Sequence, residues 1–289
     1  MTMKILLAVD GSKHGQWATE WISQIPFATP PQVTALHVID TVSLRTPFMA
    51  QPVVVGNERF IQEEIKRLET LAKKVAAETK ELLSSLNLKG KVIIERGTVA
   101  SSILKRAPKR DGLVVVGSRG LDALDRFMLG SVSTRVTQHA PCSVLVVKES
   151  ARPLRRVVLT IDGSTASQKA VQFLLRKMRP SSVDPNEGTE PILVAVVHVM
   201  PYLKYPEVKE TGQALVHYYA DKIAAAGYQV QEVPRLGNPA DEIMKVADQH
   251  KADLIVCGAK GLGAIARFLL GSISTKIVQH SSCSVLVIR

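Results

Sequence analysis

The sequence predicts two tandem α/β domains, each with a doubly wound, five-stranded parallel sheet. Short apolar runs alternate with amphipathic helical patterns along the 289 residues, which is typical of parallel sheets covered by helices. The same segments recur in the second half of the chain, at a separation too long for a solenoid repeat. The hydrophobic share is 46% and the aromatic share only 4%, so we expect cores built mainly of Val, Ile, Leu and Ala.

The duplication is visible at both ends of each copy. KILLAVDGS near the start returns as RVVLTIDGS, which aligns Asp10 with Asp162. ALHVID returns as VVHVMP, which aligns His37 with His198. The long segment from VVVGSRG to CSVLVV returns as IVCGAKG to CSVLVI. These matches indicate one domain present twice.

The elements follow in the same order in both copies. An apolar strand comes first, then an amphipathic helix such as HGQWATEWISQI, and the alternation ends with SVLVV or SVLVI. The pattern near 60–86 alternates charges, which indicates a solvated helix face with i,i+4 pairs. The charged stretch 148–155 contains Pro153, so we expect domains at residues 1–150 and 151–289. The strands are expected near 4–9, 33–39, 91–95, 113–117 and 143–147, and near 156–161, 191–199, 229–233, 253–257 and 284–288.

Charge and cysteine content narrow the functional classes. The net charge of +11 is shared, with 20 Lys and Arg against 14 Asp and Glu in residues 1–150 and 17 against 12 in residues 151–289. Without a dense basic run, this favours a mildly basic surface that attracts anionic ligands over a nucleic-acid-binding protein. No apolar run is long enough to span a bilayer, and no signal peptide is recognisable. The odd count of three cysteines suits a reducing compartment, so we expect a soluble cytoplasmic protein.

A glycine pattern near the end of each copy has the properties of a phosphate-binding loop. Gly117 and Gly120 follow the fourth predicted strand, and Gly130 and Ser131 directly precede the helical pattern SVSTRVTQHA. Glycine lets the backbone approach a ligand closely, and the start of a helix offers unpaired N–H groups to phosphate. Ser131 and Ser133 are expected to add hydroxyl donors. The second copy repeats the pattern with Gly258, Gly261, Gly271, Ser272 and Ser274.

This spacing, Gly-x2-Gly-x9-Gly-Ser, differs from the common nucleotide loops. Neither copy contains Gly-x4-Gly-Lys-Ser/Thr or Gly-x-Gly-x2-Gly. A phosphate site here would therefore consist of backbone N–H groups without a P-loop lysine. Each glycine could also be only a turn or a helix cap. The full spacing occurs twice, each time with an Asp after the first strand, and this favours a ligand site.

The first-strand Asp, the glycine spacing and the closing HAPCSVLVV resemble the universal stress protein family over nearly the whole chain. The chain looks like a tandem member of the ATP-binding type, with Rossmann-like domains. The resemblance implies that Asp10 and Asp162 lie near the ribose and phosphates, or bind Mg²⁺. It also implies that Val38 and Val199 contact the adenine.

The resemblance assigns the remaining motif positions as well. Val116 with Gly117, and Cys257 with Gly258, would flank the ribose. Arg119 and Lys260 would reach phosphate. Both sites look competent, but the resemblance does not imply equal affinity. The other positions carried over are Gly120, Gly130, Ser131, Val132 and Ser133 in the first copy, and Gly261, Gly271, Ser272, Ile273 and Ser274 in the second.

The histidines and cysteines outside this motif have simpler explanations. His139 and Cys142 form His-x2-Cys, which His280 and Cys283 repeat. A structural metal site needs about four ligands, so we expect helix-end histidines followed by small buried cysteines. Cys257 lies within a predicted buried strand, where a reactive thiol is not expected.

Four further residues could contact a ligand or serve the core. His37 and His198 lie on the second strands, near the ligand edge, and we expect structural roles for them. Trp17 and Trp21 are four residues apart on one helix face, which favours packing in the core or at an interface over base stacking.

These features favour an ATP-binding stress or signalling protein whose nucleotide occupancy biases its conformation or its partner binding. ADP and AMP are alternatives to ATP, with or without Mg²⁺. No catalytic motif is recognisable, so any hydrolysis should be slow. A slow ATP hydrolase or phosphotransferase, and a nucleotide-free scaffold or nucleic-acid-binding protein, remain as alternatives. The apolar final strands would be exposed sheet edges, so we expect them to pair, within the chain as a pseudo-dimer or between chains as a homodimer.

Overall fold

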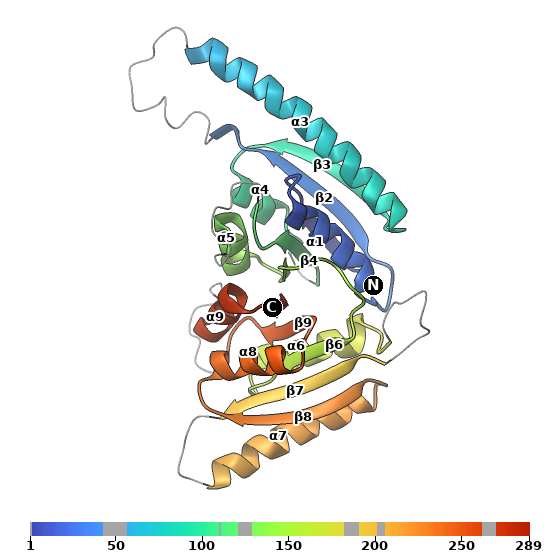
Figure 1. The fold of residues 1–289 in the computed structure, drawn as a ribbon, viewed down its shortest axis with the longest axis vertical. Coiled ribbons are helices and arrows are strands. Elements are labelled where there is room, and N and C mark those ends of the chain that lie inside the picture. The colour runs from blue at the N-terminus through green and yellow to red at the C-terminus, as the bar shows by residue number, and fades with distance from the viewer. Residues whose placement is uncertain are drawn as a thin grey trace.

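A single ten-stranded sheet runs through the molecule (Figure 1). The computed structural model describes residues 2–42, 57–109, 111–120, 129–181, 191–200, 206–261 and 270–289. Within these residues the strand order is β3-β2-β1-β4-β5-β10-β9-β6-β7-β8. The first five strands are β1 (Lys4–Ala8), β2 (Gln32–Ile39), β3 (Gly90–Arg96), β4 (Leu113–Gly117) and β5 (Ser143–Val147). The other five are β6 (Arg156–Thr160), β7 (Leu193–Met200), β8 (Gln229–Leu236), β9 (Leu254–Gly258) and β10 (Ser284–Ile288).

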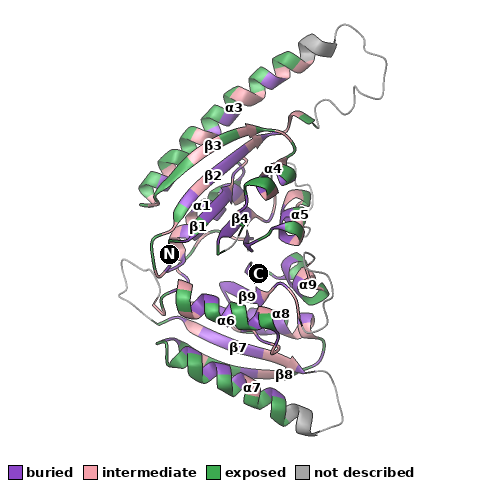
Figure 2. Cartoon of the chain, turned by 180° about the vertical axis from the view of Figure 1, so that it is seen from behind, coloured by how far each residue is buried: buried purple, intermediate pink, exposed green. Residues whose placement is uncertain are grey.

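Helices cover both faces of this sheet. Because side chains alternate along a strand, Ile5 and Leu7 join one hydrophobic core while Leu6 joins the other. Residues of α1 (Lys13–Gln24), α3 (Asn57–Ser85), α6 (Thr165–Lys177) and α7 (Pro206–Ala224) pack in the first core. Residues of α4 (Val99–Arg106), α5 (Ser131–His139), α8 (Pro239–Gln249) and α9 (Ser272–His280) pack in the second. The strands between them are mostly buried, and the outer faces of α3 and α7 are exposed (Figure 2).

The predicted α/β class is confirmed, and each half of the sheet has five parallel strands. All ten strands lie within about three residues of their predicted ends, and the long predicted helix is α3. The halves meet where β5 and β10 pair antiparallel, with Leu145 opposite Leu286 and Val146 opposite Val285. The complete sheet is therefore mixed. None of the described helices is long and apolar enough to cross a membrane.

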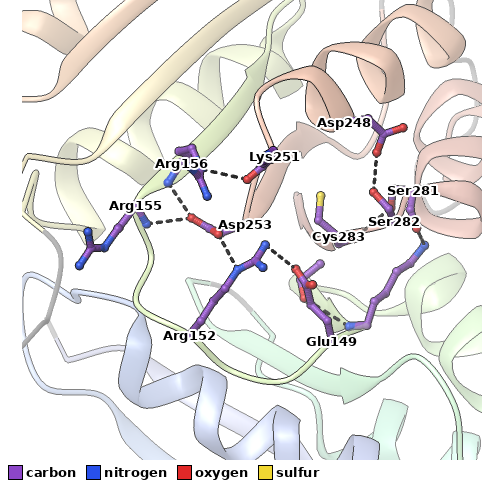
Figure 3. A network of polar contacts seen from close by, with 12 residues as sticks. Glu149, Arg152, Arg155, Arg156, Asp248, Lys251, Asp253, Ser281, Ser282 and Cys283 are labelled. Carbon is purple, nitrogen blue, oxygen red and sulfur yellow. Dashed lines mark hydrogen bonds and ion pairs between the residues drawn. The ribbon is translucent and has the colours of Figure 1, made fainter.

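Residues 148–155 connect the halves along one side of the β5–β10 pair (Figure 3). Asp253, only 1% exposed, accepts hydrogen bonds from Arg152 Nε at 2.7 Å and from the backbone N–H groups of Arg155 and Arg156 at 3.0 and 2.8 Å. Leu154 is fully buried in the core. We call residues 148–155 the connector. Its backbone is anchored by one buried carboxylate.

Two predicted structural roles are confirmed by these contacts. Trp21 is fully buried, and its indole N–H donates to the Glu149 carbonyl of the connector at 3.0 Å. His37 and His198 bond through Nδ1 to the carbonyl oxygens of Val9 and Ile161, at 3.0 and 2.9 Å. Each histidine thereby holds the backbone that follows the first strand of its half.

Candidate functional site

A cavity of about 320 Å³ opens at the carboxyl ends of β1 and β4. The strand order reverses between these two strands, since β2 and β3 lie beyond β1 while β5 lies beyond β4. Ligands of open α/β sheets commonly bind at such a switch point. All ten residues predicted for the first half line this cavity: Asp10, Val38, Val116, Gly117, Arg119, Gly120, Gly130, Ser131, Val132 and Ser133.

The turn between β1 and α1 presents Asp10 to the cavity. Gly11 has a φ of +82°, a conformation that favours glycine, and this lets the chain reverse directly after Asp10. Ser12 caps α1 by accepting from the Gly15 N–H, and its own N–H donates to Asp10 Oδ1 at 2.9 Å. A Cβ atom at Gly120 would lie 2.8 Å from Asp10 Oδ2, so the glycine leaves space for this carboxylate.

The loop after β4 folds back across the sheet end. Gly117 lies directly against α1, because a Cβ there would come within 2.7–2.9 Å of His14. The Ser118 N–H donates to the Val147 carbonyl, and its own carbonyl accepts from the Gly130 N–H at 2.8 Å. This bond brings the two ends of the glycine motif together. The residues between them, 121–128, lie outside the described part of the chain.

Helix α5 begins at the cavity without a capping side chain. Its N-cap is Gly130, whereas Ser12, Ser164 and Asn238 cap α1, α6 and α8 with their side chains. The φ of Gly130 is −60°, and a Cβ there would approach the described protein no closer than 3.3 Å. The backbone conformation therefore does not require glycine, although the 3.3 Å contact with the Ser118 carbonyl oxygen is a tight one. The effect of Gly130 is to leave the positive end of the α5 dipole open toward the cavity.

The role predicted for one serine is corrected. Ser133 is 5% exposed, and its hydroxyl donates to the Gly117 carbonyl at 2.6 Å. Ser274 makes the same bond to Gly258 at 2.7 Å. A short hydroxyl bond to the strand end satisfies the single donor of each serine, so that donor is not available to a ligand. These residues hold the start of the helix against the strand, while Ser131 is exposed at the first position of the helix.

Apolar side chains also line the cavity. They come from Leu36 and Val38 of β2, Val116 of β4, and Val99 and Ile103 of α4. The sequence prediction missed Leu36, Val99 and Ile103. Val99 and Ile103 are four residues apart in the helix after β3, and this spacing on one helix face is the signal that could have identified them.

Two histidines beside the site are neutral at pH 7. Burial, and next the nearby Arg119 guanidinium, lowers the pKa of His14. Burial also lowers the pKa of His37. Both values fall below the ordinary histidine pKa of 6.5. Among the described groups that line the cavity, the positive charge thus comes from Arg119 and the start of α5.

The second half has an equivalent but smaller cavity, of about 90 Å³, between β6 and β9. Its walls contain eight predicted residues: Asp162, Val199, Cys257, Gly258, Lys260, Gly261, Ile273 and Ser274. The other two, Gly271 and Ser272, do not line it. Asp162 Oδ1 accepts from the Ser164 N–H at 3.0 Å, and α9 also begins with an uncapped glycine. The local frame is therefore conserved between the halves while the space differs.

Three lining residues are larger in the second half than in the first. Thr160, Ile161 and Ile273 line the second cavity at the positions that Ala8, Val9 and Val132 occupy in the first half. Each exchange adds at least one heavy atom.

The cysteines lie in apolar surroundings. Cys142, Cys257 and Cys283 are buried, and burial raises their thiol pKa values to about 11, 12 and 12. His139 and His280 are exposed at the ends of α5 and α9. Among the residues that the structure describes, no three His, Cys, Asp or Glu side chains are grouped so that they could hold a metal ion.

Comparisons with known proteins agree with this architecture. The sequence profile of the Universal stress protein family matches residues 1–148 and again residues 153–289. A universal stress protein of Mycolicibacterium smegmatis is 30% identical over 302 residues, covering 99% of this chain and 96% of the relative. Universal stress protein YxiE of Bacillus subtilis is 32% identical over 145 residues, which is 46% of this chain and 98% of the relative.

A solved structure supports the fold over the same length. The crystal structure of a universal stress protein from Archaeoglobus fulgidus superposes with a TM-score of 0.70 at 20% identity, covering 99% of this chain and 96% of that one. The family profile matches twice and together spans nearly every residue. The chain therefore belongs to the universal stress protein family, with two tandem family domains.

Proposed function

We propose that the first half binds an adenine nucleotide, with ATP as the leading candidate, and that occupancy biases the conformation or the partner binding of the chain. The observation that carries this proposal is one cavity whose lining combines apolar and polar groups. Leu36, Val38 and Val116 are among the apolar ones, and Asp10 and the start of α5 are among the polar ones. A nucleotide combines an apolar heterocycle with charged phosphates, and it fits such a cavity.

The open start of α5 is the proposed phosphate position. Unpaired N–H groups at a helix N-terminus bind anions, and the helix dipole adds a partial positive charge. Gly130 leaves this end free, and Arg119 adds a formal positive charge beside it. The volume of about 320 Å³ also lies at the lower end of the range typical of small-molecule sites.

Asp10 is the group proposed to face the ribose or a nucleotide-bound Mg²⁺. Its Oδ1 is bonded to the Ser12 N–H, while no described residue hydrogen-bonds its Oδ2. A single carboxylate is enough for Mg²⁺ that arrives with its phosphates, since this ion keeps water ligands. The ion would neutralise phosphate charge, and the carboxylate would orient it.

The second half is proposed as the weaker site. Its cavity of about 90 Å³ is too small for a whole nucleotide. Asp162, Lys260 and the uncapped start of α9 nevertheless correspond to Asp10, Arg119 and the start of α5 in the first half. We expect strong binding of about one ATP per chain. We also propose a cytoplasmic location and domain limits at residues 1–150 and 151–289.

Calorimetric titration with ATP and Mg²⁺ tests this function. Gly130→Val should remove the strong binding event, because the φ of Gly130 suits valine while the new side chain fills the phosphate position. Gly271→Val is the matched control in the second half and should leave that event intact. Far-UV circular dichroism checks that both variants fold.

Nucleotide identity is tested on the purified protein. Denaturation followed by mass spectrometry should release an adenine nucleotide from the wild type and much less from Gly130→Val. The proposal fails if the wild type shows no saturable binding and releases no nucleotide. It also fails if Gly130→Val and Gly271→Val bind ATP equally well.

A further inference from the structure

A larger cavity, of about 730 Å³, lies between the two halves and shares no residue with either glycine motif. Helix α6 forms one wall, and the segments that lead into β1, β4 and β5 form the other. The end of β10, with Arg289, completes the lining. We call this space the interdomain cavity.

The internal repeat shows what fills the corresponding space on the other side of the β5–β10 pair. There the connector, residues 148–155, runs from β5 to β6. Leu154 is fully buried, and the Glu149 carbonyl accepts from the indole N–H of Trp21. The repeat aligns Arg289 with Lys148 and Met3 with Arg155, the two ends of the connector, and both Arg289 and Met3 line the interdomain cavity.

The helices that face the two spaces, α1 on the connector side and α6 at the interdomain cavity, differ in charge. The alignment of Asp10 with Asp162 places Trp17 and Gln24 of α1, and Ile25 directly after it, at the positions of Lys169, Arg176 and Lys177 of α6. The face that packs on the connector is thus uncharged at these positions, and the face that lines the interdomain cavity carries three cations. Cations in the last turn of a helix also stabilise its dipole. That effect does not account for Lys169, which lies two turns before Arg176.

Cations far exceed anions around the cavity. Lys109 and Arg289 add to the three cations of α6, and Asp111 is the one carboxylate among the described lining residues. No ion pair within the described part of the chain involves Lys109 or the three α6 cations. Like charges collected in a concave site raise the local concentration of a counter-ion.

The lining favours an anion over a further peptide segment. On the connector side, Asp253 anchors the backbone by accepting from Arg155 and Arg156. The repeat places Gly112 at the position of Asp253, so the interdomain cavity lacks that acceptor. Apart from the Asp111 carboxylate, the charged side chains of its described lining are donors, as phosphate oxygens require.

We propose that the interdomain cavity binds a small anion with several phosphate groups, and that Lys169 and Arg176 are its principal ligands. The guanidinium of Arg176 can bind a phosphate through two parallel N–H donors, and Lys169 supplies a point charge seven residues earlier on the same helix face. This site is separate from the proposed nucleotide site and does not depend on it.

Titration with inorganic tripolyphosphate tests the proposal on the full chain. The Lys169→Gln, Arg176→Gln double variant removes both charges from exposed positions, and glutamine at 176 is the residue that the first half has at Gln24. We expect one saturable event in the wild type and a loss of affinity of at least about tenfold in the double variant. The titration is repeated at about 0.15 M salt to separate the site from general charge attraction.

Two sets of controls keep the site assignment falsifiable. Lys73→Gln with Lys80→Gln removes the same charge from exposed positions of α3 and should leave binding within about twofold of wild type. If both double variants bound tripolyphosphate equally weakly, the net charge of the protein would explain the loss of affinity, and the proposal would be overturned. Binding that survives Lys169→Gln, Arg176→Gln but is lost in Gly130→Val would assign the anion to the glycine motif and also overturn it.

Discussion

The Nζ atom of Lys148, directly after β5 in the first half, donates to the carbonyl oxygen of Ser281 at the end of α9 in the second half, at 2.6 Å. The repeat places Arg289 at the equivalent position, and its guanidinium donates to the Thr137 and Gln138 carbonyls of α5 at 2.7 and 3.0 Å. Each half therefore supplies the cation that satisfies the last carbonyls of the other half's glycine-motif helix.

Lys148 should make stability depend on pH in the alkaline range. Burial lowers its pKa to about 8, whereas an unfolded lysine titrates near 10.4. Between these two pKa values the unfolded state binds more protons than the folded state, so the free energy of unfolding rises with pH. The stability that Lys148 contributes is therefore fully present above about pH 10 and is lost as the pH falls through about 8. Urea unfolding from pH 7 to 10 should show the wild type gaining stability relative to Lys148→Met.

Lys73→Met, on the exposed face of α3, is the control for that series. Its difference from wild type should not change with pH, because an exposed lysine has similar surroundings when folded and unfolded. If the difference in unfolding free energy between wild type and Lys148→Met were also independent of pH, it would contradict the role given to Lys148.

Asp253→Ala should destabilise the join between the halves. The substitution leaves the backbone N–H groups of Arg155 and Arg156 without their acceptor and removes one of the two carboxylate partners of Arg152. We expect a loss of about 2–4 kcal/mol in the free energy of unfolding, measured with urea. Asp248→Ala breaks the exposed bond to Ser282 in the same region and should cost less than about 1 kcal/mol. Similar losses in both variants would count against the connector anchor.

Enlarging the second cavity should increase ATP binding there. The triple variant Thr160→Ala, Ile161→Val, Ile273→Val gives the second half the residues that line the first cavity. Calorimetry should then show the stoichiometry rise from about one to about two ATP per chain, because steric volume is what limits this site. The reverse exchange in the first half, Ala8→Thr, Val9→Ile, Val132→Ile, should weaken the strong site. An unchanged stoichiometry in the first variant would mean that cavity size does not limit the second half.

All three thiols should be unreactive in the folded protein. Burial raises the pKa of Cys142 to about 11 and of Cys257 and Cys283 to about 12, so very little thiolate exists at pH 8. A disulfide reagent such as DTNB should label none of them on the native chain within minutes and all three in guanidinium chloride. Rapid labelling of one native thiol would show that its strand opens locally.

The sequence by itself determined the strands, their succession along the chain and ten of the residues that line the first cavity. Those features depend on local periodicity, on residues close together in the chain and on a repeat that is visible in the letters. Strict alternation of short apolar strands and helices predicts a parallel sheet, and its switch point necessarily brings Asp10 beside Gly117.

Only the tertiary structure decided how the available space and donors are used. The pairing of β5 with β10, the bond that satisfies the Ser133 hydroxyl and the smaller cavity of the second half all depend on contacts between distant residues. The cation-lined interdomain cavity depends on them too, since Lys169 and Lys109 belong to different halves. The volume left by packing and the partner of each hydrogen bond depend on residues that are brought together only in the folded chain. A local sequence pattern therefore does not predict them.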